Sequence, residues 1–174
     1  MKKIACVGYH ATGAGVIDDL FREFDNVAQG QYEVESRLLQ DPDGISDLEY
    51  NLVDNPHRLN SGFAVKRFLK YVKTTNRTYT KIFGRKWKQL SEQYAHSLAT
   101  FEFQGYWHGD VWLLNPFWRY LHKFRRGIAK ILPKAIRKPA YYNYFPWLKS
   151  YHFNLTKEEF YKKTQNYIDE LCSA

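Results

Sequence analysis

The chain is poor in the residues that stabilise disulfide-rich or metal-bound domains, with two cysteines, Cys6 and Cys172, in 174 residues. Cysteines so far apart match neither a disulfide framework nor a zinc site, and we expect no metal. The chain also lacks an apolar run of about 18 residues, the length that predicts a membrane-spanning helix. The apolar run Ile4 to Gly8 is shorter than the core of a signal peptide, roughly 7–15 residues. We therefore expect an intracellular, cytoplasmic protein.

Aromatic residues are abundant, at 18% of the chain, while hydrophobic residues make up 44% and charged residues 25%. These proportions are typical of a folded protein and exclude a disordered chain. The aromatic side chains supply a sizeable core because each one buries a large area. The length predicts a single domain over residues 1–174.

Charge divides the chain into two parts. Residues 1–60 contain 5 Lys/Arg and 11 Asp/Glu, so they carry −6, whereas residues 61–174 contain 21 and 7 and carry +14. A basic second part indicates an anionic partner, and a nucleotide, a nucleic acid or an anionic membrane all fit. The alternative is a basic surface that only contacts solvent.

The pattern of the acidic part predicts the opening of an α/β protein. Residues 2–8 form an apolar run typical of a buried strand, a glycine-containing turn follows, and residues 14–25 carry apolar side chains on one helical face. Residues 32–39 predict a second strand or an extended edge, DPDG at 41–44 a turn, and residues 45–53 a short helix. We expect an α-rich fold with few strands and an incomplete sheet, which suggests the first part of a longer fold. Because one or two strands leave open edges, we expect marginal stability or a homodimer.

The basic part is predicted to be helical. Ser61 is expected to cap a helix, and Asn115-Pro116 predicts the start of another that runs to Leu132. Between them, residues 85–100 predict a helix whose inward side chains are Trp87, Leu90, Tyr94 and Leu98. The sequence does not indicate the secondary structure of residues 77–84. It predicts an ordered loop over residues 101–116 and a connector over residues 139–154. The sequence Thr156-Lys-Glu-Glu159 is a capping box, and its helix places one apolar stripe inward, formed by Phe160, Thr164, Tyr167, Ile168 and Leu171.

The glycine turn has the composition of a phosphate loop. Gly8 and Gly13 let the backbone approach a phosphate, and the positive end of the next helix attracts the anion. The Lys and Ser/Thr of a Walker A motif are missing, which argues against ATP or GTP hydrolysis, and the third glycine of a Rossmann motif is missing too. The residues of the turn that can contact a phosphate are His10, Thr12, Gly13, Ala14 and Gly15. The alternative is a strand–helix turn without a ligand.

The segment VGYHATGAGVIDDL resembles the 5′-phosphosulfate loop of the sulfotransferase family, which typically reads G-x-x-x-S-G-T-T after the first strand. Gly8, Thr12 and Gly13 match it, although Ala11 and Ala14 stand where a basic residue is common. A second block of the family, E-T-R-F-x-x-x-x-G-L-x-x-L, is similar to residues 35–48, ESRLLQDPDGISDL. The resemblance covers residues 2–50 and implies a fold of the P-loop nucleoside triphosphate hydrolase type, with three layers that begin as strand, phosphate loop and helix.

The resemblance also implies a reaction. The donor is 3′-phosphoadenosine 5′-phosphosulfate, bound by the turn and by Arg37, and a sulfonate group moves to a hydroxyl group of a sugar or glycan. Such a transfer needs a base, and Glu35 is the candidate because a carboxylate follows the loop at a similar distance in some members. The alternative for Glu35 is a structural pairing with Arg37. His57 is a second candidate for the base, and His108 a third.

Residues 117–138 hold 8 Lys/Arg and no acidic residue, with an apolar stripe formed by Phe117, Leu121, Phe124, Ile128 and Ile131. This pattern is typical of a helix that lies on an anionic membrane surface. The interpretation favoured by the sequence is a helix packed on the domain through that stripe. Single-stranded nucleic acid is a third, less favoured partner, because no sequence motif for it is present.

Overall fold

The computed structural model describes residues 14–21, 23–27, 36–105, 107–133 and 148–173. The chain divides into two compact units, Met1–Glu35 and Ser36–Ala174, which are considered separately. The predicted strand at 2–8 lies outside the described residues, as does the glycine turn before residue 14. The second predicted strand, at 32–39, lies outside them up to residue 35, and residues 36–39 form no strand.

The described part of unit 1 contains one helix, α1 (Ala14–Phe21). The sequence predicted a helix as far as residue 25. Instead, the backbone closes into tighter turns, in which the amide of Glu23 donates to Leu20 O (3.2 Å) and that of Phe24 to Phe21 O (3.3 Å). The predicted apolar face is exposed at Val16, Ile17 and Leu20.

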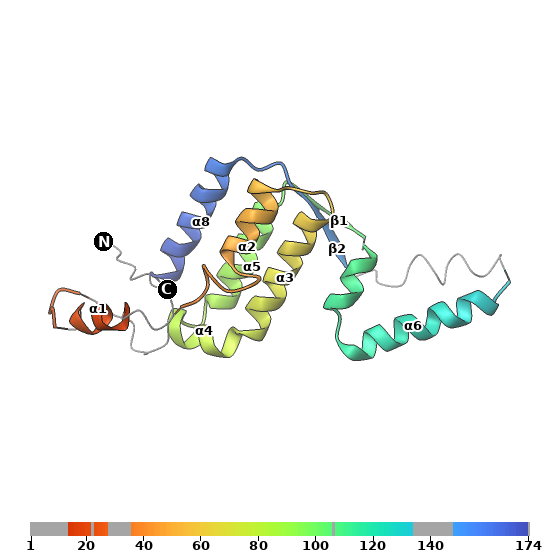
Figure 1. Cartoon of the computed structure of the whole chain (residues 1–174), viewed down its shortest axis with the longest axis horizontal. Helices are drawn as coiled ribbons and strands as arrows, with labels where there is room; N and C mark the ends of the chain where they lie inside the picture. Colours follow the sequence, from red (N-terminus) through yellow and green to blue (C-terminus); the bar gives the residue numbers. More distant parts are fainter. Residues whose placement is uncertain (1–13, 22, 28–35, 106, 134–147, 174) are drawn as a thin grey trace. The chain divides into compact units, whose positions relative to one another are not determined.

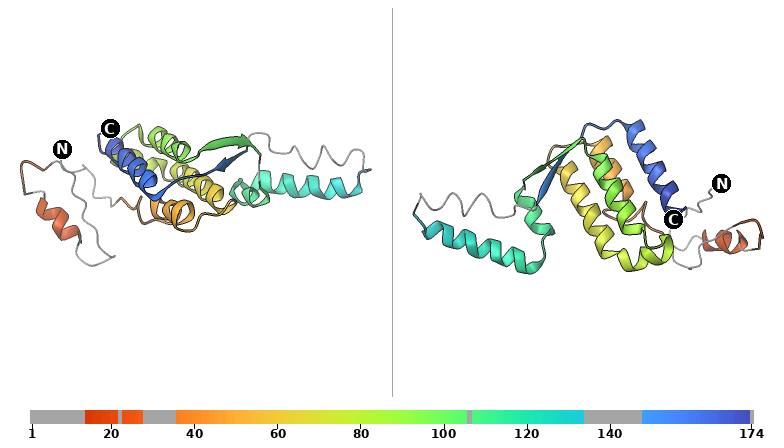
Figure 2. Two further views of the ribbon diagram at one scale, coloured as in Figure 1. Left: turned by 90° about the horizontal axis from the view of Figure 1, so that it is seen from above. Right: turned by 180° about the vertical axis from the view of Figure 1, so that it is seen from behind.

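Unit 2 is α-rich with few strands, as the sequence predicted (Figure 1). Its helices α3, α5 and α8 lie side by side in every view, and α2 lies against α3 (Figure 2). The helices of this bundle are α2 (Ile45–Glu49), which continues as the π-helical turn η1 (Tyr50–Asp54), α3 (Asn60–Thr74), α4 (Asn76–Phe83), α5 (Trp87–Leu98) and α8 (Lys157–Leu171). Among the described residues, none of the helices combines the length and the apolar content needed to cross a membrane.

A small antiparallel sheet joins two distant segments of unit 2. Strand β1 (Phe101–Gln104) pairs with β2 (Lys149–His152), with Phe101 opposite His152. The prediction of a loop over residues 101–116 was therefore wrong at its start, because the partner strand lies far along the chain. The 3-10 helix η2 (His108–Leu113) and α6 (Pro116–Ile131) lie between the two strands in the sequence.

Aromatic and aliphatic side chains together form the core of unit 2. The largest fully buried ones are Trp87 on α5, Phe68 on α3 and Phe160 on α8. Tyr94 on α5 stacks on Tyr167 on α8, with ring centroids 4.3 Å apart and ring planes 4° apart. The inward residues predicted for α5 and α8 are confirmed, except that Leu90 and Ile168 are only partly buried.

Two predicted helix starts are confirmed and one is wrong. Thr156 and Glu159 form the capping box of α8, in which the Thr156 amide donates to Glu159 Oε2 at 3.0 Å. Asn115 Oδ1 accepts the Trp118 amide of α6 at 3.1 Å. Ser61, in contrast, does not cap α3. It is buried inside that helix, and its hydroxyl bonds to the preceding segment instead.

The turn before α2 leaves no space for a side chain at Gly44. A Cβ atom there would lie 2.5 Å from Leu38 O and 2.8 Å from Asp41 O, both of them backbone atoms. Asp43, the residue before it, has a φ of 68°, a left-handed conformation that aspartate tolerates better than most residues. The tight turn brings Leu38, Ile45 and Leu48 into one core.

We predict that Gly44→Ala lowers the free energy of unfolding by about 1–3 kcal/mol, because the backbone around the added methyl group has to move. Urea denaturation followed by circular dichroism measures this change. The matched control is Gly127→Ala in α6, where no atom lies within 4 Å of the Cβ position. The control should keep the free energy unchanged or raise it slightly, since alanine favours a helix. Equal effects of the two substitutions would contradict the prediction.

Candidate functional site

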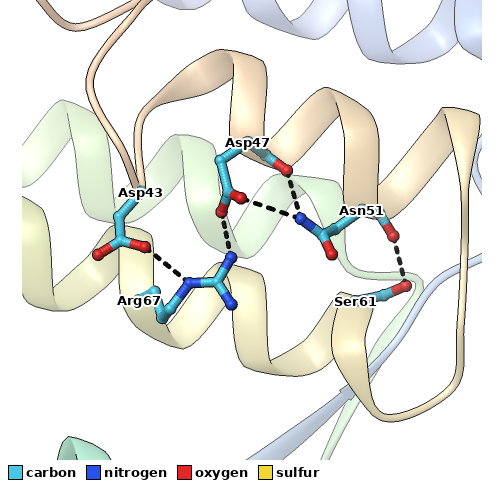
Figure 3. A network of polar contacts seen from close by, with 5 residues as sticks. All are labelled: Asp43, Asp47, Asn51, Ser61 and Arg67. Carbon is cyan, nitrogen blue, oxygen red and sulfur yellow. Dashed lines mark hydrogen bonds and ion pairs between the residues drawn. The ribbon is translucent and has the colours of Figure 1, made fainter.

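A polar network connects the turn at residues 41–44 to α2 and α3 (Figure 3). At its centre, Arg67 Nε on α3 donates to Asp43 Oδ1 at 2.7 Å, and its Nη2 forms an ion pair with Asp47 on α2. Partial burial disfavours the charged guanidinium, but the hydrogen bonds and charges of Asp47 and Asp43 outweigh this effect, so the pKa of Arg67 is raised. Arg67 thus holds the turn, through Asp43, and α2, through Asp47, against α3.

The network continues from α2 towards His57. Asn51 Nδ2 donates to the backbone oxygen of Asp47 at 2.8 Å and to its Oδ1 at 3.1 Å. The Ser61 hydroxyl donates to Asn51 O at 2.6 Å and accepts the backbone amide of His57 at 3.0 Å. Unbroken polar contacts therefore lead from Asp43 to the turn that carries His57 (Figure 3 shows them as far as Ser61).

His57 is exposed, and one of its ring nitrogens has a structural role. Its Nδ1 atom accepts the backbone amide of Leu59 at 3.3 Å, which orients the ring at the start of α3. Because Nδ1 accepts a hydrogen bond, the neutral ring carries its proton on Nε2. His57 thus combines a structural role with a ring exposed to solvent.

Few of the predicted site residues fall in the described parts of the chain. Gly8, His10, Thr12, Gly13 and Glu35 lie outside them, and the backbone of His108 begins η2. Ala14 and Gly15 form the start of α1 in unit 1.

Arg37 is exposed in unit 2, where its backbone oxygen accepts the amides of Gln40 (2.9 Å) and Asp41 (2.8 Å). No hydrogen bond or ion pair within the described segments joins Arg37 to His57. The described part of the structure therefore joins these two predicted site residues by neither kind of polar contact.

Sequence reasoning missed the central role of Arg67. A signal was present, because Asp43 and Asp47 are four residues apart, at the turn and in the first turn of the predicted helix. Two such carboxylates are a suitable partner for the forked donors of an arginine. The sequence does not show that this helix packs against α3. That packing decides that Arg67, among many basic residues, meets the two carboxylates.

Within the residues that the structure describes, no group of three or more His, Cys, Asp or Glu side chains is arranged to hold a metal ion. Comparisons of the chain with protein-family models, curated proteins and solved structures found no match.

We predict that Arg67→Met lowers the free energy of unfolding by about 1–2 kcal/mol, since two carboxylates lose a charged hydrogen-bond donor at a partly buried site. Thermal and urea unfolding measure the loss. The control is Lys88→Met, which removes an exposed ion pair with Glu92 (3.8 Å) and should cost less than about 0.5 kcal/mol. A loss for Arg67→Met as small as that of the control would show that the network contributes little.

Proposed function

We propose that the chain is a sulfotransferase-like protein, which binds a phosphorylated adenosine donor and transfers a sulfonate group to a hydroxyl group of a sugar or glycan. The observation that carries the proposal is the start of α1. This helix begins at Ala14, directly after Gly13, the last residue of the predicted phosphate loop. The first turn of a helix has amide groups without acceptors in the helix, and its positive end attracts a phosphate.

The residues at the start of α1 are compatible with a bound anion. The first turn contains no acidic side chain that would repel a phosphate. Beside Gly15, no atom lies within 4 Å of the Cβ position, so the backbone is open to a ligand. The residues of unit 1 proposed to hold the donor are Gly8, His10, Thr12, Gly13, Ala14 and Gly15.

In the proposed reaction, an oxygen–sulfur bond forms to the acceptor hydroxyl while the bond from sulfur to the bridging phosphate oxygen breaks. The acceptor proton passes to a base, for which Glu35 is the candidate. The leaving group is adenosine 3′,5′-bisphosphate, and positive charge near its bridging oxygen stabilises the transition state. The amide groups of the loop are the proposed source of that charge.

Isothermal titration calorimetry with adenosine 3′,5′-bisphosphate tests donor binding. We expect saturable binding to the wild-type chain and its loss in Gly13→Val, because the side chain would occupy the space of the phosphate. Gly127→Val in α6 is the control for a glycine-to-valine change and should bind like the wild type. Absence of saturable binding to a folded wild-type chain would overturn the proposed function.

A second experiment identifies the base. Glu35→Gln is expected to lower sulfonate transfer from radiolabelled donor to a panel of monosaccharides by about 10²–10⁴-fold, with unchanged donor binding, because only proton acceptance is lost. His57→Asn keeps an acceptor for the Leu59 amide and should retain the wild-type rate. A wild-type rate for Glu35→Gln would show that Glu35 is not the base.

A further inference from the structure

Helix α6 has an apolar face that is exposed. Phe117, Tyr120 and Phe124 are 66%, 73% and 64% exposed, and Ile128 and Ile131 continue the same face with 41% and 87%. Their spacing of three and four residues places them on one side of the helix. Contrary to the interpretation favoured by the sequence, these side chains do not pack on the domain, although Leu121 is partly buried.

The side on which α6 is buried is a different one. Ala129 is buried, and Trp118 and His122 are partly buried. At 100° per residue these three positions fall within a narrow arc, roughly a quarter turn or more from the centre of the exposed apolar face. Burial lowers the pKa of His122, and the charge of Arg126 adds to this effect. The exposed apolar face thus lies away from the buried positions of the helix.

The charges of α6 complement an anionic surface. The helix contains five basic residues and no acidic one, the basic residues being Arg119, Lys123, Arg125, Arg126 and Lys130. On the helical wheel, Lys123 and Arg125 flank the apolar face, one on each side. The other three basic residues lie farther from that face, towards the opposite side of the helix. Long basic side chains in flanking positions reach the headgroups of a lipid layer while the apolar face enters it.

The structure ties the start of this helix to the bundle. Lys66 on α3 forms an ion pair of 2.5 Å with buried Asp110 in η2, and Asp110 also accepts the Trp107 amide at 2.8 Å. From α6, Arg119 Nε donates to Leu114 O at 2.8 Å, which fixes the first turn to the end of η2. Trp112 in η2 is 68% exposed, and tryptophan is favoured where a membrane meets water.

We propose that α6 docks on a bilayer that contains anionic lipids, with Phe117, Tyr120, Phe124, Ile128 and Ile131 entering the apolar layer. A second copy of the chain fits less well, because it would bring a second set of five cations to the same face. Single-stranded RNA fits less well too, because Ile128 and Ile131 offer no ring on which a base can stack. The docking surface goes beyond the proposed function and does not depend on nucleotide binding.

Co-sedimentation of the full chain with vesicles tests the proposal. We expect binding to vesicles of phosphatidylcholine with phosphatidylserine, and at least about tenfold weaker binding to pure phosphatidylcholine, since each basic residue near the surface contributes to the attraction. The double variant Phe124→Ser/Ile128→Ser should also bind at least about tenfold more weakly, because less apolar area enters the lipid. Leu39→Ser, at an exposed apolar residue outside α6, is its control and should bind like the wild type.

A second pair of variants tests the charges. Lys123→Gln/Arg125→Gln should weaken binding to anionic vesicles more than Lys81→Gln/Lys88→Gln, which removes the same net charge from exposed positions on α4 and α5. Equal binding to neutral and anionic vesicles would overturn the proposal. Binding of the chain to single-stranded RNA but not to vesicles would also overturn it. The same holds if the chain does not bind vesicles but self-associates, and the Phe124→Ser/Ile128→Ser variant abolishes that self-association. Circular dichroism confirms that each variant is folded.

Discussion

The buried tyrosine hydroxyls of unit 2 impose a constraint on which its helix packing depends. A hydroxyl group inside an apolar core is costly unless it has a hydrogen-bond partner. Tyr94 on α5 meets Thr164 on α8 at 2.7 Å, and Tyr167 on α8 meets Ser91 on α5 at 2.6 Å. These two reciprocal bonds, together with the stacked rings, determine which faces of α5 and α8 meet. Burial raises the pKa of both tyrosines, so they stay neutral at physiological pH.

The same constraint extends to the acidic segment of the chain. Tyr71 on α3 bonds to Tyr79 on α4 at 2.7 Å, and its hydroxyl also donates to Asp41 Oδ2 at 2.9 Å. Asp41 belongs to the turn that Arg67 holds through Asp43. The boundary in charge at residue 60 is therefore not a boundary in packing, because the core includes Leu38, Ile45, Leu48 and Leu52 as well as α3, α5 and α8.

The division of the aromatic residues between core and surface relates the fold to the proposed roles. In the bundle, aromatic rings are buried in contacts between helices. On α6, in contrast, Phe117, Tyr120 and Phe124 are exposed to solvent on a helix rich in basic residues. A docking surface on α6 and a phosphate loop before α1 would suit a transferase whose acceptor is presented at a membrane. The two proposals rest on separate parts of the chain, and each can be tested without the other.

Local patterns in the sequence were sufficient for several elements. The capping box at Thr156, the Asn115-Pro116 start of α6 and the inward residues of α5 were predicted because each depends on neighbours within a few residues. The pairing of β1 with β2 was not predictable in this way, because FEFQ becomes a strand only when a distant segment lies beside it. The prediction that Ser61 caps α3 was wrong for a similar reason. Its hydrogen-bond partners, Asn51 and His57, precede the helix and come close to Ser61 only when the segment before α3 is folded.

The sequence by itself determined that α3, α5, α6 and α8 are helices and that α6 is amphipathic. Only the tertiary structure decided which amphipathic faces are buried. The apolar stripes of α8 and α6 look alike in the sequence, yet the first is in the core and the second is exposed. The physical reason is that burial depends on a complementary partner face. Helix α5 provides Tyr94 and Ser91 to α8, whereas the buried Ala129 and partly buried Trp118 of α6 lie on another side than its apolar stripe. Apolar residues spaced three and four positions apart define one face of a helix, but they do not determine which part of the protein covers that face.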